Sequence, residues 1–287
     1  MASSRQMRKR ISSVRSIRQI TKAMKMVAAA RLRKAQDMII SARPYARKIE
    51  EVLSDISSRT DISRIKILQP SKGKKVLLFV ITADKGLCGS FNSNILRRAM
   101  KFMTEHHNKN IELIAVGRKG RDFFKRRELI VRHSEVDAFR ELRFELAAAL
   151  RDGMVDPYLN NEVGEVHLIY NEFKSAMAQR VICKQFLPVS FEKPTTEENH
   201  SKTDFIYEPF PEAVFSELLP QYFAIEIWNA LLESYAAEMG ARMTSMESAT
   251  KNASEMISRL TLVSNRIRQA GITREIAEIV GGAEALK

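Results

Sequence analysis

Residues 20–35 read ITKAMKMVAAARLRKA, and their apolar side chains recur at steps of three and four. The same spacing extends in both directions, from Met7 to Ile56, over about seven heptads. The apolar positions are Met7, Ile11, Val14, Ile17, Ile20, Met24, Val27, Leu32, Ala35, Met38, Ala42, Ile49, Val52 and Ile56. This period is typical of a helix that packs along another helix as a coiled coil. We therefore predict a long helix over residues 1–58, which Pro44 kinks without ending it.

A second seam of the same kind occupies residues 212–287, with Pro220 near its start. Its apolar positions are Leu219, Phe223, Trp228, Leu232, Tyr235, Met239, Met243, Met246, Ala249, Ala253, Met256, Leu260, Val263, Ile267 and Ala270. Because each seam needs a partner and the other seam is the nearest one, we predict that the two helices form a long antiparallel coiled coil. Their lengths leave about 20 C-terminal residues without a partner, roughly 30 Å of helix.

Between the two seams the hydrophobic period changes. Residues 76–82 form a continuous run rich in Val and Ile, as expected for a buried parallel strand. Further strands are predicted at 111–117, 128–132, 165–170 and 180–187, and helices at 94–106, 118–127 and 140–155. This alternation favours a central Rossmann-like α/β domain over residues 75–191, with a mainly parallel sheet. Residues 192–211 are polar and rich in proline, so they are predicted to be a loop.

The charge of the chain is concentrated at one end. Residues 1–48 hold 14 Lys and Arg against one acid, Asp37, and so carry the whole net charge of +13. A focused charge of this kind predicts an acidic partner for the segment. The first 20 residues have the composition of a transit peptide, but the helical pattern runs through them without a break, which favours a segment that is kept.

Cysteine use and hydropathy exclude two classes of protein. Cys88 and Cys183 are too few and too far apart for a disulfide framework or a Cys/His metal site, and they suit a reducing compartment. The longest apolar run, residues 76–81, is far shorter than the ~20 residues that a membrane span needs. We therefore expect a chain that lies at most at the periphery of a membrane.

The sequence also lacks the motifs of an active site. The turn at residues 86–90 follows a strand and contains two glycines, but it has neither the Lys-Ser/Thr pair of a phosphate loop nor a GxGxxG fingerprint. The five histidines have no metal-ligand spacing, and GxSxG is absent. We therefore predict a protein that is not an enzyme, with no catalytic residue, no cofactor and no metal.

Two other classes of function compete with that prediction. A nucleic-acid binder with a basic arm would suit the charge, but residues 1–44 contain no aromatic side chain that could stack on bases. The basic groups also surround the seam instead of preceding it as a separate basic region. A Rossmann-type enzyme is disfavoured by the missing fingerprint. We therefore expect no nucleic-acid partner.

Three segments carry a resemblance to a known family. They are residues 20–35, quoted above, DKGLCG at 84–89 and NRIRQAGITREIAEIVGGA at 265–283. Together they resemble the signature segments of the γ subunit of F-type ATP synthase, of the bacterial type. The resemblance implies the central rotor shaft of a proton-translocating complex. It further implies that the coiled coil turns inside a ring of three α and three β subunits, while the foot and the ε subunit rest on the membrane c-ring.

The resemblance also implies roles for individual residues. Met24 and Lys25 match positions that contact the β subunits, whose acidic loops would be the partner of the basic segment. Arg268, Gln269 and Thr273 match positions in the last helix that meet a β-subunit loop, and Tyr207 matches a foot residue near ε and the c-ring. The implied location is the cytoplasmic side of the cell inner (plasma) membrane. The plant pair of regulatory cysteines is absent, so no thiol switch is expected.

Overall fold

The computed structural model describes residues 4–60, 65–189 and 205–284, which form two compact parts. The coil part consists of residues 4–29 and 242–284, and the α/β part lies within residues 30–241. Two long helices contribute to both parts: α1, Ser4–Arg59, with 56 residues, and α5, Pro211–Glu284, with 74 residues. Pro44 lies inside α1 and Pro220 inside α5, so neither proline ends its helix, as predicted.

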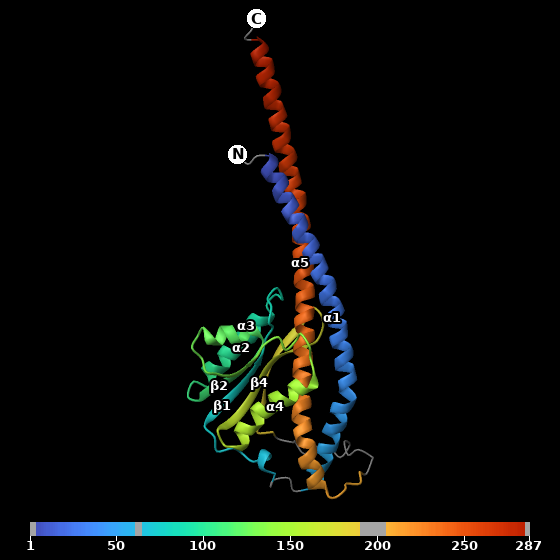
Figure 1. Ribbon diagram of the computed structural model, residues 1–287, viewed down its shortest axis with the longest axis vertical. Helices are drawn as coiled ribbons and strands as arrows, with labels where there is room; N and C mark the ends of the chain where they lie inside the picture. The colour runs from blue at the N-terminus through green and yellow to red at the C-terminus, as the bar shows by residue number, and fades with distance from the viewer. Residues whose placement is uncertain (1–3, 61–64, 190–204, 285–287) are drawn as a thin grey trace. The chain divides into compact units, whose positions relative to one another are not determined.

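The α/β part is built on a five-stranded sheet with the order β3-β2-β1-β4-β5 (Figure 1). The strands are β1, Lys75–Ile81; β2, Asn110–Val116; β3, Val131–Glu135; β4, Val163–Phe173; and β5, Gln179–Leu187. β1 pairs in parallel with β2 and β4, and β2 in parallel with β3. β5 pairs antiparallel with β4. The mainly parallel sheet that the sequence predicts is therefore confirmed.

The central strand β1 is buried on both faces, which explains its uninterrupted apolar run. Leu77, Phe79 and Ile81 pack in one core cluster with α4, Phe144–Leu159, and with parts of α1 and α5. Val76 and its neighbours of the same parity pack in a second cluster with α2, Phe91–Glu105, and α3, Arg118–Lys125. Helices thus cover both faces of the sheet.

Two predicted elements are displaced along the chain. The strand expected at 128–132 is β3 at Val131–Glu135, because Glu128 has a positive φ of 57° and still belongs to the turn after α3. The helix expected at 140–155 begins at Phe144 and continues to Leu159, with Pro157 in its last turns. A short 3₁₀ helix, η2, spans Lys66–Leu68. Most of the loop predicted at 192–211 lies outside the described residues.

In the coil part, α1 and α5 run antiparallel to each other. The Thr250 hydroxyl donates a hydrogen bond of 2.8 Å to Thr21 Oγ1, and Lys25 Nζ lies 2.6 Å from Glu247 Oε1. Continuing this register brings the first residue of α1 level with Ile267. All residues from 268 to 283 are exposed, in agreement with the predicted unpartnered tail of α5.

The seam itself differs from the prediction over residues 17–28. Ile17, Ile20 and Val27 were expected to face the partner helix, but their side chains are 52%, 58% and 53% exposed. Thr21 and Ala28, which were not expected in the seam, are buried. The predicted seam is therefore wrong in this stretch, although the coiled coil itself is confirmed.

The physical reason for this error is helical drift. The predicted seam takes three successive steps of three between residues 11 and 20, and each falls short of the 3.6 residues of a turn. The stripe therefore winds away from the partner helix. Strict alternation of four and three from Val14 passes through Arg18, Thr21, Lys25 and Ala28 instead, and Thr21 and Lys25 are the residues that bond to α5.

Gly117, which precedes α3, gives a test of the fold. Its φ is 91°, and an added Cβ would lie 2.1 Å from the carbonyl oxygen of Thr82. We expect Gly117→Ala to lower the free energy of unfolding by at least ~2 kcal/mol, because both the strain and the clash involve backbone. Gly153→Ala in α4 is the control, since nothing lies within 4 Å of its added Cβ, and it should stabilise by roughly 0.5–1 kcal/mol. If Gly117→Ala and Gly153→Ala changed the free energy of unfolding in urea by the same amount, the strained, closely packed turn at Gly117 would be contradicted.

Candidate functional site

A second apolar stripe on α1 lies beside the seam. Ile17, Ile20, Met24 and Val27 follow one another at steps of three, four and three, so they share one face of the helix. Three of them are exposed, and Met24 is half-buried beside the seam. The helix therefore has one stripe that α5 covers and another that residues 4–60, 65–189 and 205–284 leave uncovered. Contiguous exposed apolar side chains of this kind typically mark an interaction surface.

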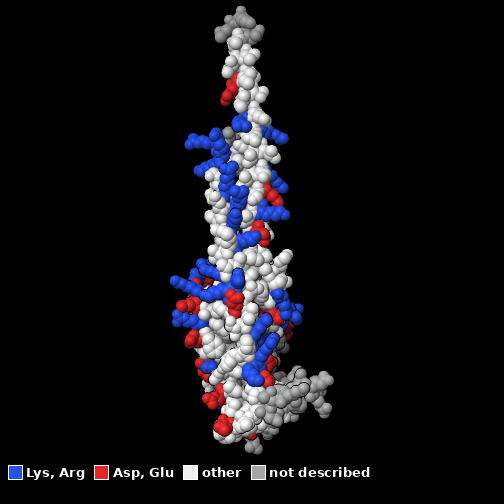
Figure 2. Space-filling view, turned by 90° about the vertical axis from the view of Figure 1, so that its right-hand side faces the viewer, with Lys and Arg blue, Asp and Glu red and all other residues white. Residues whose placement is uncertain are grey.

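The helix that carries the outer stripe is strongly basic. The basic residues of α1 in the coil part are Arg5, Arg8, Lys9, Arg10, Arg15, Arg18, Lys22 and Lys25, and residues 4–29 contain no acid. Figure 2 shows Lys and Arg gathered along the coil part on the face that it presents. A basic helix with an exposed apolar stripe suits a partner surface that offers both acidic and apolar side chains.

Lys25 does not simply point to solvent. Its ion pair with Glu247 of α5 is surface-exposed, with the two side chains 37% and 60% accessible. A pair of this exposure contributes little to stability, and its charges can be shared with an incoming acidic group. Met24 is half-buried at the border between the seam and the outer stripe. Of these two consecutive predicted contact residues, Met24 thus belongs to the outer stripe and Lys25 to the seam.

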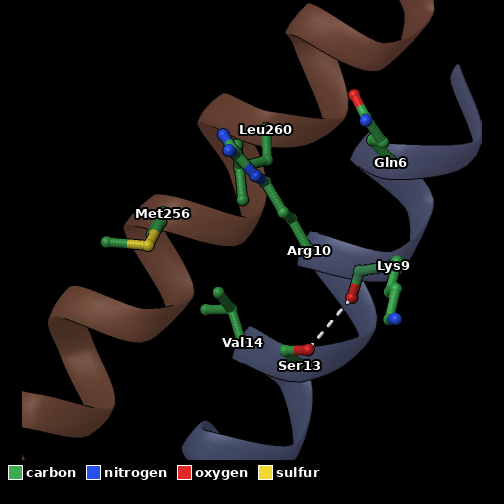
Figure 3. Close-up of a pocket in the computed structure, with 7 residues that line it drawn as sticks. All are labelled: Gln6, Lys9, Arg10, Ser13, Val14, Met256 and Leu260. Atoms are coloured by element: carbon green, nitrogen blue, oxygen red, sulfur yellow. Dashed lines mark hydrogen bonds between the residues drawn. The ribbon is translucent and has the colours of Figure 1, made fainter. Parts of the chain in front are cut away.

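A groove of about 550 Å³ lies between α1 and α5 near the start of α1. Its lining residues are Gln6, Lys9, Arg10, Ser13, Val14, Met256 and Leu260. Figure 3 shows the Arg10 side chain extending across it toward Leu260. The Ser13 hydroxyl donates to the carbonyl oxygen of Lys9. The groove repeats the pattern of the outer stripe, with apolar side chains beside cations.

The predicted contact residues of the last helix lie on its unpartnered tail. Arg268, Gln269 and Thr273 are exposed, and the Thr273 hydroxyl donates to the carbonyl oxygen of Gln269 at 3.0 Å. The tail also exposes large apolar side chains, namely Ile272, Ile276, Ile279 and Val280. A helix with no partner in its own chain and an apolar surface needs another molecule to cover it.

Tyr207 lies in the short segment that precedes α5. Its hydroxyl donates a 2.7 Å hydrogen bond to Oδ2 of Asp55, a buried residue of α1. Its neighbours Ile206 and Phe210 are 90% and 54% exposed. The bond anchors the segment to the end of α1, so that these apolar neighbours face outward.

The turn after β1 is held by side-chain hydrogen bonds to backbone N–H groups. Asp84 Oδ1 accepts the backbone N–H groups of Arg118 (2.9 Å) and Asp137 (3.0 Å). Asn92 Oδ1 accepts the N–H of Ala83 at 2.9 Å. Arg118 follows β2 and Asp137 follows β3, so the Asp84 carboxylate ties together the ends of three neighbouring strands.

Within 4–60, 65–189 and 205–284, no three His, Cys, Asp or Glu side chains converge as a metal site would require. None of the helices in the described part of the chain combines the length and hydropathy of a membrane span.

The fold and these surfaces define a class of protein. It is a subunit with an α/β part and a coiled coil of its two terminal helices, and it acts through contacts with other molecules. The chain belongs to the ATP synthase γ chain family. A family model described as ATP synthase matches residues 3–286. The chain is 48% identical to the ATP synthase gamma chain of Anaeromyxobacter sp. (strain Fw109-5) and 47% identical to that of Desulforamulus reducens, in both cases over 100% of each chain.

Solved structures agree with this assignment. The central stalk and c-ring structure of Tetrahymena thermophila mitochondrial ATP synthase contains a chain that is 31% identical, with a TM-score of 0.59 over 80% of this chain and 99% of that one. A rotor chain of the Euglena gracilis enzyme, 20% identical, shares the fold with a TM-score of 0.66 over 94% and 98% of the two chains. The chain is therefore a non-catalytic γ subunit, the central rotor shaft of an F-type ATP synthase, which is a membrane-attached complex.

The seam pair Lys25–Glu247 can be tested on the chain alone. We expect a double-mutant cycle with Lys25→Ala and Glu247→Ala to give a coupling of ~0–1 kcal/mol in urea unfolding, because both partners are exposed. Lys75–Glu112 is the contrast: this pair is 2.7 Å long, and the Glu112 side chain is only 10% exposed. Hydrogen bonding to Lys75 holds the pKa of Glu112 below its usual range. A coupling at Lys25–Glu247 larger than that at Lys75–Glu112 would contradict the assignment of a weak pair.

Proposed function

We propose that the coil part turns inside a ring of three α and three β subunits, driven by proton flow through the c-ring. The asymmetric coil forces the three β sites in turn through different states, so that nucleotide chemistry stays on the β subunits. The observation that carries the proposal is the outer stripe of α1, an apolar face that this chain builds and leaves exposed. The membership of the γ chain family supports it.

Met24 and Lys25 are proposed to contact the β subunits next to this stripe. The acidic loops at the base of β would meet the cations of α1 through many weak ion pairs, each worth ~0–1 kcal/mol. A rotor needs contacts that form and break easily, so many weak pairs suit it better than a few strong ones. The exposure of the Lys25–Glu247 pair supports the proposal of weak ion pairs, because an exposed pair exchanges partners at little cost in free energy.

Arg268, Gln269 and Thr273 are proposed to meet a loop of one β subunit at a time. Their exposure on a helix without an intrachain partner supports this role. The apolar residues that follow them would turn in an apolar collar of the ring. Such a collar offers surface burial without directional bonds, which allows rotation.

The α/β part is proposed to form the foot, with the ε subunit and the c-ring as partners. Tyr207 would then hold its segment against Asp55, so that Ile206 and Phe210 face those partners. The proposed location is the cytoplasmic side of the cell inner membrane, at its periphery. The proposed functional division is a helix over 1–58, a foot over 75–191 and a helix over 212–287.

The outer stripe gives the direct test of assembly. We expect Ile20→Asp to weaken association with separately expressed α and β subunits at least about tenfold, because the stripe becomes anionic where an acidic partner must approach. The matched control is Ile40→Asp on the same helix, since Ile40 is 61% exposed but is not part of the stripe. Association is measured by co-purification and by the ATPase activity of the assembled complex.

The same comparison can also overturn the proposal. Equal assembly of Ile20→Asp and wild type would exclude the stripe as a ring contact. Retention of the wild-type chain on a DNA column at physiological salt, with no assembly, would favour a nucleic-acid binder instead.

A further inference from the structure

The packing of α5 on the β4–β5 hairpin contains polar groups at a place where apolar ones would be expected. Glu226 of α5 forms an ion pair with Lys184 of β5 at one end of this contact. At the other end, an added Cβ on Gly240 would lie 3.2 Å from Cα of Ala176, just after β4. α5 therefore runs along the hairpin, and Glu233 lies midway between the two contacts.

Several buried polar atoms of α5 and β4 have no hydrogen-bond partner within the described residues. They include Oε2 of Glu233, Oγ of Ser234 and Nδ2 of Asn171. Asn171 is a buried residue of β4 and Ser234 a buried residue of α5. A carboxylate that is buried without a donor is costly when it is charged, so the geometry favours the neutral acid at Glu233.

Charged and titratable groups reach Glu233 from every element around it. They are Tyr170, Glu172 and Lys174 of β4 and the segment after it, Lys184 of β5, Arg43 of α1, and Glu226 of α5. The cations and the acids largely offset each other, so burial decides the balance. Burial, aided by the charge of Glu172, raises the pKa of Glu233 to about 7.

We propose that Glu233 is a proton-dependent fastener between α5 and the β4–β5 hairpin, closed when the carboxyl is neutral and loosened when it ionises. The neutral acid has no net charge to solvate at the position where its Oε2 atom is buried. The carboxylate leaves a charged oxygen buried without a donor, and a movement of the hairpin away from α5 would admit water to that oxygen. The attachment of the sheet to the long helix thereby becomes sensitive to pH near neutrality. This inference concerns the chain alone and does not depend on the proposed contacts with the ring.

The direction of the pH dependence follows from the two states. In the unfolded chain Glu233 ionises near its ordinary value, whereas in the folded chain it keeps its proton up to about pH 7. The folded state therefore holds one more proton between these values, and stability falls as the pH rises through that window. Above the folded-state pKa both states are ionised, and this contribution becomes constant.

The test compares wild type with Glu233→Gln, which keeps the size of the side chain and cannot ionise. We expect the unfolding equilibrium constant of wild type, relative to that of Glu233→Gln, to rise at least about tenfold between pH 5 and pH 7.5. Amide exchange in residues 170–183, corrected for the chemical rate, should rise several-fold over the same interval in wild type and stay level in the variant. Glu217→Gln, at an exposed position of the same helix, should follow wild type.

Parallel pH profiles for wild type and Glu233→Gln would overturn the proposal. If Glu233→Gln does not fold, the exchange measurement on wild type decides the question. A rise in exchange of the hairpin with a midpoint near pH 7 supports the fastener, and a flat profile rejects it. Because no ring subunit is present, a failure here would leave the assembly test of the outer stripe unaffected.

Discussion

The burial of α5 between Phe215 and Ala241 is the constraint on which the α/β part depends. Phe223 and Leu231 belong to the core cluster on one face of the sheet, whereas Ala237 and Ala241 belong to the cluster on the other. One helix therefore joins both cores. Its small residues let it approach the hairpin closely, and replacing them with larger ones would separate the sheet from the helix. A torque on α5 must accordingly act on the whole α/β part, as a shaft requires.

The coil part shows the complementary property. There α1 divides its apolar residues between a seam that α5 covers and an outer stripe that the described residues leave exposed. The seam contains Thr21 and Lys25, so it gives up some hydrophobic burial. Ile17 and Ile20, which could have filled it, are left for a partner. The same sequence thus gives the coiled coil a moderate stability and keeps apolar side chains on its exposed face. Both properties suit a subunit that is proposed to contact a ring while it turns.

Much of this could be predicted from the sequence, because long periodic helices and a buried central strand leave strong patterns. The register of the seam could not be read from apolarity alone, since the outer stripe of α1 is more apolar than the seam beside it. A strict alternation of three and four would have found it. The roles of Asp84 and Glu233 depend on contacts between residues far apart in the chain, which no local pattern encodes.

Rotation is the central claim, and a reversible tether tests it most directly. Met24→Cys is combined with a cysteine on the facing β-subunit loop, with Cys88 and Cys183 replaced by serine. Met24 lies in the two-helix coil, well away from the unpartnered tail, so unwinding beyond the tether should not restore turning. A rotor predicts that oxidation abolishes steady-state ATP hydrolysis by the assembled complex and that reduction restores it. Full-rate hydrolysis by quantitatively crosslinked complex would contradict the account, because a static scaffold loses nothing when it is fastened.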